Sequence, residues 1–272
     1  MDRKKPKIIT VASIKGGVGK STTALVFSDI LSSKNYKTLL IDLDPQASST
    51  SFYINLIKNK DIDIKQINIY RVLKKELDIE NSIINVSENI DFISSHLTLS
   101  QFNEESISLK ESLLKIFLSY IKSKYDFIIM DTAPTLGSLL NNSLIITDYL
   151  IIPLPTDQWA IESLDLIANR LKDIFRSKLP TFYLITNLIE RQSIDKELRE
   201  FIKNEYKGKF LGSVPKRDNL RKSIFHRDKF NPNEDYYRAY QEILEKFLSK
   251  IKDPFHSELL DPNGTDLNGG IQ

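Results

Sequence analysis

The sequence has no cysteine among its 272 residues. This absence excludes disulfide bonds, thiolate metal sites and cysteine nucleophiles, and with them a cysteine-ligated iron–sulfur cluster. Long apolar runs are missing too, because none approaches the roughly 18–20 residues that a membrane-spanning helix needs. The first residues carry no signal-peptide pattern. We therefore expect a cytoplasmic protein.

A large excess of charge of one sign is also absent. The 38 Lys and Arg residues nearly balance the 36 Asp and Glu residues, which leaves a formal net charge of +2. This balance argues against a protein that coats nucleic acid over its whole surface, so any such contact must come from a local patch. The apolar share of 41% is enough for the core of one large domain.

Apolar strand patterns alternate with helical patterns along most of the sequence. Strands are expected at residues 7–13, 38–42, 90–94, 127–131, 149–153, 182–187 and 210–214, and helices at about residues 20–33, 69–77, 109–123, 138–147, 160–175 and 235–251. This alternation predicts an α/β fold, a doubly wound and mostly parallel sheet with helices on both faces. We expect one domain over residues 1–252. Residues 253–272, rich in Asp, Pro, Asn and Gly, are expected to be a disordered tail.

A glycine-rich loop is the sharpest functional signal. Residues 14–22 read IKGGVGKST and lie between an expected strand and an expected helix, which is the context that a phosphate-binding loop requires. Glycines allow a tight turn that aims backbone N–H groups at phosphate oxygens, and the helix N-terminus adds its dipole. The Lys20 side chain can reach the β- and γ-phosphates, and the Ser21 hydroxyl can ligate Mg²⁺. The expected nucleotide contacts in this loop are Gly16, Gly17, Val18, Gly19, Lys20, Ser21 and Thr22.

Carboxylates end two of the expected strands. Asp42 and Asp44 follow residues 38–41, and Asp131 follows the apolar run FIIM at residues 127–130. The carboxyl ends of parallel strands form the edge at which open α/β sheets bind ligands, so these groups are candidates for a metal and catalytic site. A simpler interpretation stays open, in which a carboxylate only caps a turn or a helix.

Together these motifs resemble the ParA/MinD family of P-loop ATPases. An ordinary phosphate loop has glycine at position 14, whereas this chain has Ile14 followed by Lys15-Gly16-Gly17, the deviant Walker A form. The segments DPQ at 44–46, APTLG at 133–137 and PTD at 155–157 are similar to plasmid and chromosome partition ParA proteins. Ala47 and Ser48 depart from the Gly and Asn that are frequent in those proteins.

The resemblance implies a role for each site residue. Lys15 would cross a dimer interface to the partner's nucleotide, and Asp44 would position the attacking water. Asp131 would hold Mg²⁺ through water, and Asp42 would support the Mg²⁺ shell. The resemblance also assigns adenine recognition to Asn187, with Pro215 shaping the loop against the base. The implied cofactors are ATP or ADP and Mg²⁺.

The resemblance further implies an ATP-dependent homodimer that binds nonspecific DNA, associates with the nucleoid and is released when a ParB-like partner stimulates hydrolysis. Residues 216–229 (KRDNLRKSIFHRDK) hold six Lys or Arg against two Asp, which supplies a local cationic patch. The candidate DNA contacts are Lys216, Arg217, Arg221 and Lys222. An ordinary solvated face is the alternative. We expect no N-terminal helix-turn-helix domain, and therefore no sequence-specific DNA binding.

Three other functions compete with partition. A MinD-like ATPase would bind membrane through a basic terminal helix, but the amphipathic helix expected at 235–251 precedes a non-basic tail and is expected to pack on the core. A synthetase-like relative would need a small-substrate pocket that the sequence does not indicate. A non-hydrolysing scaffold is disfavoured by intact Lys15, Lys20, Asp44 and Asp131. Residues 55–120 carry no functional signal.

The first prediction concerns Lys20. Replacing it with Ala removes the cation expected at the β- and γ-phosphates, so the Lys20→Ala variant should lose ATP binding, measured by calorimetry. Unchanged ATP affinity in a folded variant would contradict the phosphate site.

Overall fold

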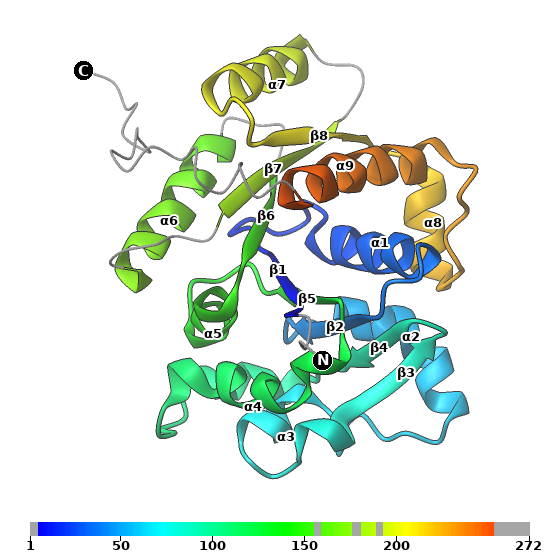
Figure 1. Ribbon diagram of the computed structural model, residues 1–272, viewed down its shortest axis with the longest axis vertical. Coiled ribbons are helices and arrows are strands. Elements are labelled where there is room, and N and C mark those ends of the chain that lie inside the picture. Colours follow the sequence, from blue (N-terminus) through cyan, green and yellow to red (C-terminus); the bar gives the residue numbers. More distant parts are fainter. Residues whose placement is uncertain (1–4, 155–158, 176–180, 189–192, 253–272) are drawn as a thin grey trace.

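A parallel sheet forms the centre of the molecule (Figure 1). The computed structural model describes residues 5–154, 159–175, 181–188 and 193–252, and in this part of the chain eight strands run in the order β3-β4-β2-β5-β1-β6-β7-β8. Neighbours are parallel except for the β3–β4 hairpin at one edge. The strands are β1 (Lys7–Val11), β2 (Thr38–Leu43), β3 (Ile83–Ser87), β4 (Ile90–Ile93), β5 (Phe127–Thr132), β6 (Tyr149–Leu154), β7 (Thr181–Leu188) and β8 (Phe210–Pro215).

Helices cover both faces of the sheet. One face carries α1 (Lys20–Ser33), α2 (Ser48–Asn59), α8 (Asp218–His226) and α9 (Asp235–Lys252); the other carries α3 (Ile69–Leu73), α4 (Leu113–Ile121), α5 (Ser138–Ile146), α6 (Trp159–Ile174) and α7 (Ser193–Glu205). Short 3₁₀ turns span Ile79–Ser82, Leu97–Asn103, Lys110–Ser112 and Lys122–Lys124. In β5, Ile129 packs into the first layer, and Ile128 and Met130 pack into the second. The predicted doubly wound α/β fold is confirmed.

The central strand β1 marks a change of direction in the winding of the sheet. The chain passes from β1 through α1 to β2 on one side, and after β5 it passes through α5 to β6 on the other side. Connections that leave a parallel sheet in opposite directions open a crevice at the carboxyl ends of the strands. Loops after β1, β2 and β5 lie at this crevice, where the sequence predicts the functional site.

Two predicted helices are shorter in the structure. The helix expected at 109–123 is the α-helix Leu113–Ile121, because Leu109 has a left-handed backbone (φ 61°) and the next residues form a 3₁₀ turn. The helix expected at 69–77 ends at Leu73, before Lys75 adopts φ 63°. The sequence did not predict α2, β3 or α7. The expected tail at 253–272 and the PTD segment at 155–157 lie outside the described residues.

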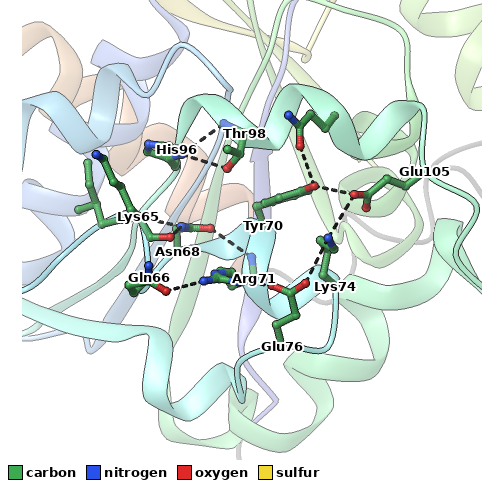
Figure 2. Close-up of polar contacts among 12 residues, drawn as sticks. Lys65, Gln66, Asn68, Tyr70, Arg71, Lys74, Glu76, His96, Thr98 and Glu105 are labelled. Carbon is green, nitrogen blue, oxygen red and sulfur yellow. Dashed lines mark hydrogen bonds and ion pairs between the residues drawn. The ribbon is translucent and has the colours of Figure 1, made fainter.

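Polar contacts hold α3 in the region for which the sequence predicts no function (Figure 2). The Asn68 side chain caps the helix by accepting from the Arg71 amide at 3.1 Å. The Tyr70 hydroxyl donates to Glu105 Oε1 at 2.6 Å, and Lys74 lies 3.1 Å from Glu76. Because these ion pairs are partly exposed, each adds little stability, and we interpret the network as anchoring the segment around Glu105 to α3.

The helix α9 is a core helix, as predicted. Tyr236, Tyr240 and Phe247 are fully buried, and the Tyr240 hydroxyl lies 3.2 Å from Thr23 Oγ1 on α1. The Phe247 ring packs edge-on against Tyr149 and Tyr183 of the sheet. Among the described residues, we find no helix with the length and apolar character needed to cross a bilayer.

The second prediction tests this packing. Phe247→Ala removes a fully buried ring that packs against side chains of β6 and β7, so the free energy of unfolding should fall by about 3–5 kcal/mol, measured by urea denaturation. The exposed neighbour Glu242 supplies the control, because Glu242→Ala on the same helix should change stability by less than about 0.5 kcal/mol. Equal small effects would mean that α9 does not complete the core.

Candidate nucleotide and magnesium site

The ends of three adjacent strands bring the predicted motifs together. β5 lies between β1 and β2, and in their registers Asp131 pairs with Val11 on one side and with Asp42 on the other. The glycine-rich loop leaves β1 shortly after Val11, and the DPQ segment leaves β2 directly after Leu43. One sheet edge thus carries the phosphate loop and both strand-end carboxylates.

The loop after β1 has the backbone that phosphate binding requires. Gly17 (φ 74°) and Gly19 (φ 91°) are in the left-handed region, which residues with a Cβ rarely adopt. Gly16 and Gly17 are exposed, and a Cβ added at either would meet no atom within 4 Å. Gly19 is the N-cap residue of α1, and because it has no side chain, no side-chain hydrogen bond caps the first amides of the helix. This arrangement leaves a helix N-terminus suited to an anion.

Lys20 starts α1 and is buried. Its exposed fraction is 6%, and its Nζ donates to the carbonyl oxygen of Lys15 in the same loop at 3.0 Å. Burial lowers the pKa of Lys20, and the negative charges of Asp131 and Asp44 act in the opposite direction. The Lys15 side chain is half-buried, and Ser21 and Thr22 are half-buried in the first turn of α1.

Asp131 is fully buried with one oxygen unpaired. Oδ2 accepts a hydrogen bond from the Ser49 hydroxyl at 2.7 Å, whereas Oδ1 is buried without a hydrogen-bond partner among the described residues. Burial raises the pKa of Asp131 to about 6 from 3.8, although the Ser21 and Ser49 hydroxyls hold it lower. A buried, unpaired carboxylate oxygen is costly, which makes this atom a place for a cation or its bound water.

Asp42 differs from Asp131 because its oxygens are occupied. Oδ2 accepts from both the backbone amide and the hydroxyl of Thr50, each at 2.8 Å, and Oδ1 accepts from the Asp44 amide at 3.1 Å. Burial, and then the nearby Asp131 charge, raise the pKa of Asp42 well above its ordinary value. The geometry gives Asp42 an anchoring role for the following turn and for α2.

Asp44 lies near Lys20 and Asp131. Its side chain is nearly buried, and Oδ1 accepts from the Gln46 amide at 2.8 Å in a tight turn. The Ser95 hydroxyl donates to the Asp44 carbonyl oxygen at 2.8 Å. Asp44 is close enough to Lys20 and Asp131 to affect their pKa values. The turn therefore fixes this carboxylate beside the phosphate loop.

The donor set fits Mg²⁺. Magnesium prefers hard oxygen ligands and usually keeps several waters, binding through one or two protein groups and substrate phosphates. Ser21 and Asp131 Oδ1 offer such oxygens at one end of the loop. No cluster of three or more His, Cys, Asp or Glu residues that could hold a metal occurs within the described ranges. This fits a metal shared with a phosphate rather than an all-protein cage.

The residues predicted to recognise adenine lie on neighbouring strands. Asn187 of β7 pairs in register with Val214, and Leu188 pairs with Pro215 at the end of β8. Both residues are therefore at the carboxyl end of the sheet. Their assignment to the base stays a prediction.

The predicted DNA contacts lie at the end of β8 and on α8. Lys216, Arg221 and Lys222 are exposed, as is the Phe225 side chain at 79%. Arg217 is different, because its Nε donates to Asp235 Oδ2 at 2.6 Å across the start of α9. Three of the four candidate cations thus form an open surface, and the fourth is ion-paired.

Sequence reasoning missed three hydroxyl residues of the site. Ser49 and Thr50 bind the two strand-end carboxylates, and Ser95 binds both Thr50 Oγ1, through its amide at 2.8 Å, and the Asp44 carbonyl. A signal was present for the first two, because a Ser-Thr pair a few residues after a strand-end Asp favours local capping of carboxylates and amides. Ser95 had no such signal.

Comparisons with known proteins identify relatives of this chain. Residues 6–184 match the model of a family described as an AAA domain. An uncharacterised protein of Methanocaldococcus jannaschii is 36% identical over 263 residues, which cover 90% of this chain and 99% of that protein. The sporulation initiation inhibitor protein Soj of Bacillus subtilis is 30% identical over 76% of this chain and 83% of its own length.

A solved structure is similar over nearly the whole chain. A protein of Borrelia burgdorferi B31 assigned to plasmid partition, crystallised with AMPPNP bound, is 45% identical with a TM-score of 0.86. The match covers 91% of this chain and 100% of that structure.

The third prediction follows from the pKa of Asp131. Because the folded-state pKa of about 6 lies above 3.8, the folded protein holds this proton more tightly than the unfolded chain. The contribution of the Asp131 carboxyl group to the free energy of unfolding is greatest below the pKa of the unfolded chain, and it is lost as the pH rises through about 6. Without nucleotide and metal, Asp131→Asn should therefore be more stable than the wild type above about pH 6, and this advantage should shrink toward about pH 4.

Urea denaturation across that pH range measures the difference, with Glu88→Gln as a control at an exposed position. An Asn variant whose stability follows the wild-type pH dependence would show that Asp131 does not carry this buried charge.

Proposed function

The chain belongs to the ParA family of P-loop ATPases, and we propose that it is a DNA-partition ATPase whose ATP-bound dimer binds nonspecific DNA. The observation that carries the proposal is the buried Oδ1 of Asp131, which has no hydrogen-bond partner in the described part of the chain and lies beside a phosphate loop with two lysines. Hydrolysis would return the protein to a state with weak DNA affinity. The output of the cycle is then the location of the protein and its cargo.

Nucleotide binding is assigned to the β1–α1 loop. The backbone amides of the loop and of the first turn of α1 would receive the phosphate oxygens. Lys20 would exchange its present acceptor, the Lys15 carbonyl, for the β- and γ-phosphates, which neutralises a buried cation with a buried anion. Thr22 would contact the α-phosphate. The AMPPNP bound to the Borrelia relative supports ATP as the ligand class.

Magnesium is assigned to the Ser21 hydroxyl and to Asp131, with Asp42 anchoring the turn behind them. When bound, the ion neutralises charge on the β- and γ-phosphate oxygens. Asp131 is oriented by the hydrogen bond to Oδ2, and its burial excludes bulk water from this side of the site. The two strand-end carboxylates, whose pKa values are raised by burial, would both gain from a nearby divalent cation.

Hydrolysis is assigned to Asp44 and to Lys15 of a second copy. Asp44 would orient the attacking water, since the turn at Gln46 holds its carboxylate close to Lys20. Lys15 lies in the loop beside exposed glycines, where a second copy can approach. A lysine that arrives from the partner stabilises charge on the leaving phosphate only after dimerisation. This makes hydrolysis slow for the isolated chain and open to stimulation by a ParB-like protein.

DNA binding is assigned to residues 216–229. Exposed cations at Lys216, Arg221 and Lys222 can contact phosphates without reading bases. A dimer presents two such surfaces, so the second contact becomes intramolecular and the dimer binds much more tightly than the monomer. We infer that the protein is cytoplasmic and associates with the nucleoid in the ATP state. A MinD-like membrane function is not favoured, because the apolar face of α9 is buried in the core.

The fourth prediction tests the DNA surface. Affinity for a nonspecific duplex should be high with ATP and low with ADP or no nucleotide, measured by fluorescence anisotropy at several salt concentrations. The Arg221→Ala/Lys222→Ala double variant should bind more weakly with ATP. The slope of log K against log salt should also fall by about 1 for each phosphate that the variant no longer neutralises.

The control is Lys115→Ala/Lys124→Ala, because it removes the same charge at exposed positions around α4, on the opposite face of the sheet. Wild-type DNA binding that ignores the nucleotide would refute the proposed function. A double variant with unchanged affinity and salt slope would refute the assignment of the surface.

A further inference from the structure

The first turn of α2 contacts both the metal-site carboxylates and the end of the basic segment. Residues 49–52 make these contacts, and the turn directly follows the DPQ segment that carries Asp44. It begins after Ala47, which has a left-handed backbone (φ 53°). The turn therefore connects two features with separate proposed functions, the strand-end carboxylates and the basic segment.

Ser49 determines which oxygen of Asp131 remains available. Its fully buried hydroxyl donates to Oδ2 at 2.7 Å, and Oδ1 is the oxygen without a partner among the described residues. A hydrogen bond to one oxygen of a carboxylate fixes the plane of that group and directs the other oxygen. Ser49 therefore orients Asp131 toward the place assigned to Mg²⁺.

Thr50 attaches the same turn to the neighbouring strand. Its amide and hydroxyl both donate to Asp42 Oδ2 at 2.8 Å, and its Oγ1 accepts from the Ser95 amide at 2.8 Å. Since all of these groups are buried, the turn cannot shift independently of the strand-end carboxylates without breaking hydrogen bonds away from water, which is costly. The start of α2 is thus tied to the ends of β2 and β5.

Ser51 and Phe52 attach the other side of the turn to the basic segment. The Arg227 Nε donates to the Ser51 carbonyl at 2.8 Å, and Arg227 is the C-cap residue directly after α8, with φ 61°. The Phe52 ring stacks on Phe230, with centroids 5.1 Å apart and planes 7° from parallel. The end of α8 and the residues after it are therefore held by the same turn that orients Asp131.

We propose that Ser49 is a positioning residue for the magnesium site and that the turn Ser49–Phe52 couples this site to the DNA-binding surface on α8. A cation that binds at Asp131 Oδ1 shifts the carboxylate to which Ser49 donates, and the turn moves with this carboxylate. Arg227 and Phe230 contact the turn and therefore move with it. This proposal rests on the function proposed above and adds, beside dimerisation, a physical connection within each chain by which the nucleotide state changes DNA affinity. Two measurements test its two halves.

The fifth prediction begins with Ser49→Ala. Without the hydroxyl, Oδ2 loses its partner and the carboxylate loses its fixed orientation, so Mg²⁺ affinity in the ADP complex should fall by about 10- to 100-fold. The readout is ADP affinity by calorimetry across a Mg²⁺ titration, and ADP affinity without Mg²⁺ should stay unchanged. The control is Ser143→Ala, whose equally buried hydroxyl donates to the Leu140 carbonyl within α5. Wild-type Mg²⁺ dependence in Ser49→Ala would overturn the positioning role.

The coupling itself is tested with Arg227→Lys, which keeps the charge of the basic segment but lacks the guanidinium that reaches Ser51. Its ratio of DNA affinities with ATP and ADP should contract by at least about 2-fold while ATP affinity stays the same. Arg238→Lys is the matched control, because it makes the same exchange at an exposed position of α9, outside the basic segment, where the guanidinium also donates to a backbone carbonyl, that of Asn233 at 2.8 Å; it should keep the wild-type ratio.

The outcomes separate the two proposals. If wild-type DNA binding does not depend on the nucleotide, the proposed function fails. If wild-type binding depends on the nucleotide and Arg227→Lys keeps the full ratio, only the coupling through α2 is wrong.

Discussion

The structure depends on buried charges that do not balance one another at the ends of β1, β5 and β2. Asp131 and Asp42 are fully buried on adjacent strands, and one cation, Lys20, is buried with them. Burial pushes all three groups toward their neutral forms, as the directions of their pKa values show. A triphosphate and a divalent cation bring complementary charges to this place. Ligands with these charges would therefore stabilise the site, which is a simple physical basis for a nucleotide switch.

The surrounding fold supplies the rigidity that this arrangement requires. β5 and β1 are central strands buried on both faces, so Asp131 and the start of the phosphate loop are fixed by the sheet register. The DPQ turn and α2 are attached to the same edge through Asp42. The Ser49 hydroxyl satisfies Asp131 Oδ2, and the Thr50 hydroxyl adds a second hydrogen bond to Asp42 Oδ2 beside that of the Thr50 amide. Among the oxygens of these two carboxylates, Asp131 Oδ1 is the one without a partner in the described structure, and its isolation singles out the metal position.

Much of this was predictable from the sequence, because the relevant signals are local. The β1–loop–α1 unit, the strand-end aspartates and the core helix α9 each follow from apolar periodicity and glycine placement. Other elements were not predictable in the same way. Helix α2 begins with Ser-Ser-Thr-Ser, residues with weak helix propensity, and its start is stabilised by tertiary bonds to Asp42 and Asp131. The left-handed Leu109, which shortens the helix expected at 109–123, likewise has no local signal.

The packing of α9 has a consequence for synthesis of the chain. In sequence order α9 is the last described element, yet Tyr240 and Phe27 pack edge-on and Tyr240 contacts Thr23 in the helix that begins with Lys20. A nascent chain on the ribosome must release every residue up to α9 before that early helix acquires its final neighbour. Until then, the buried face of α1 that carries Thr23 and Phe27 lacks the last element that covers it.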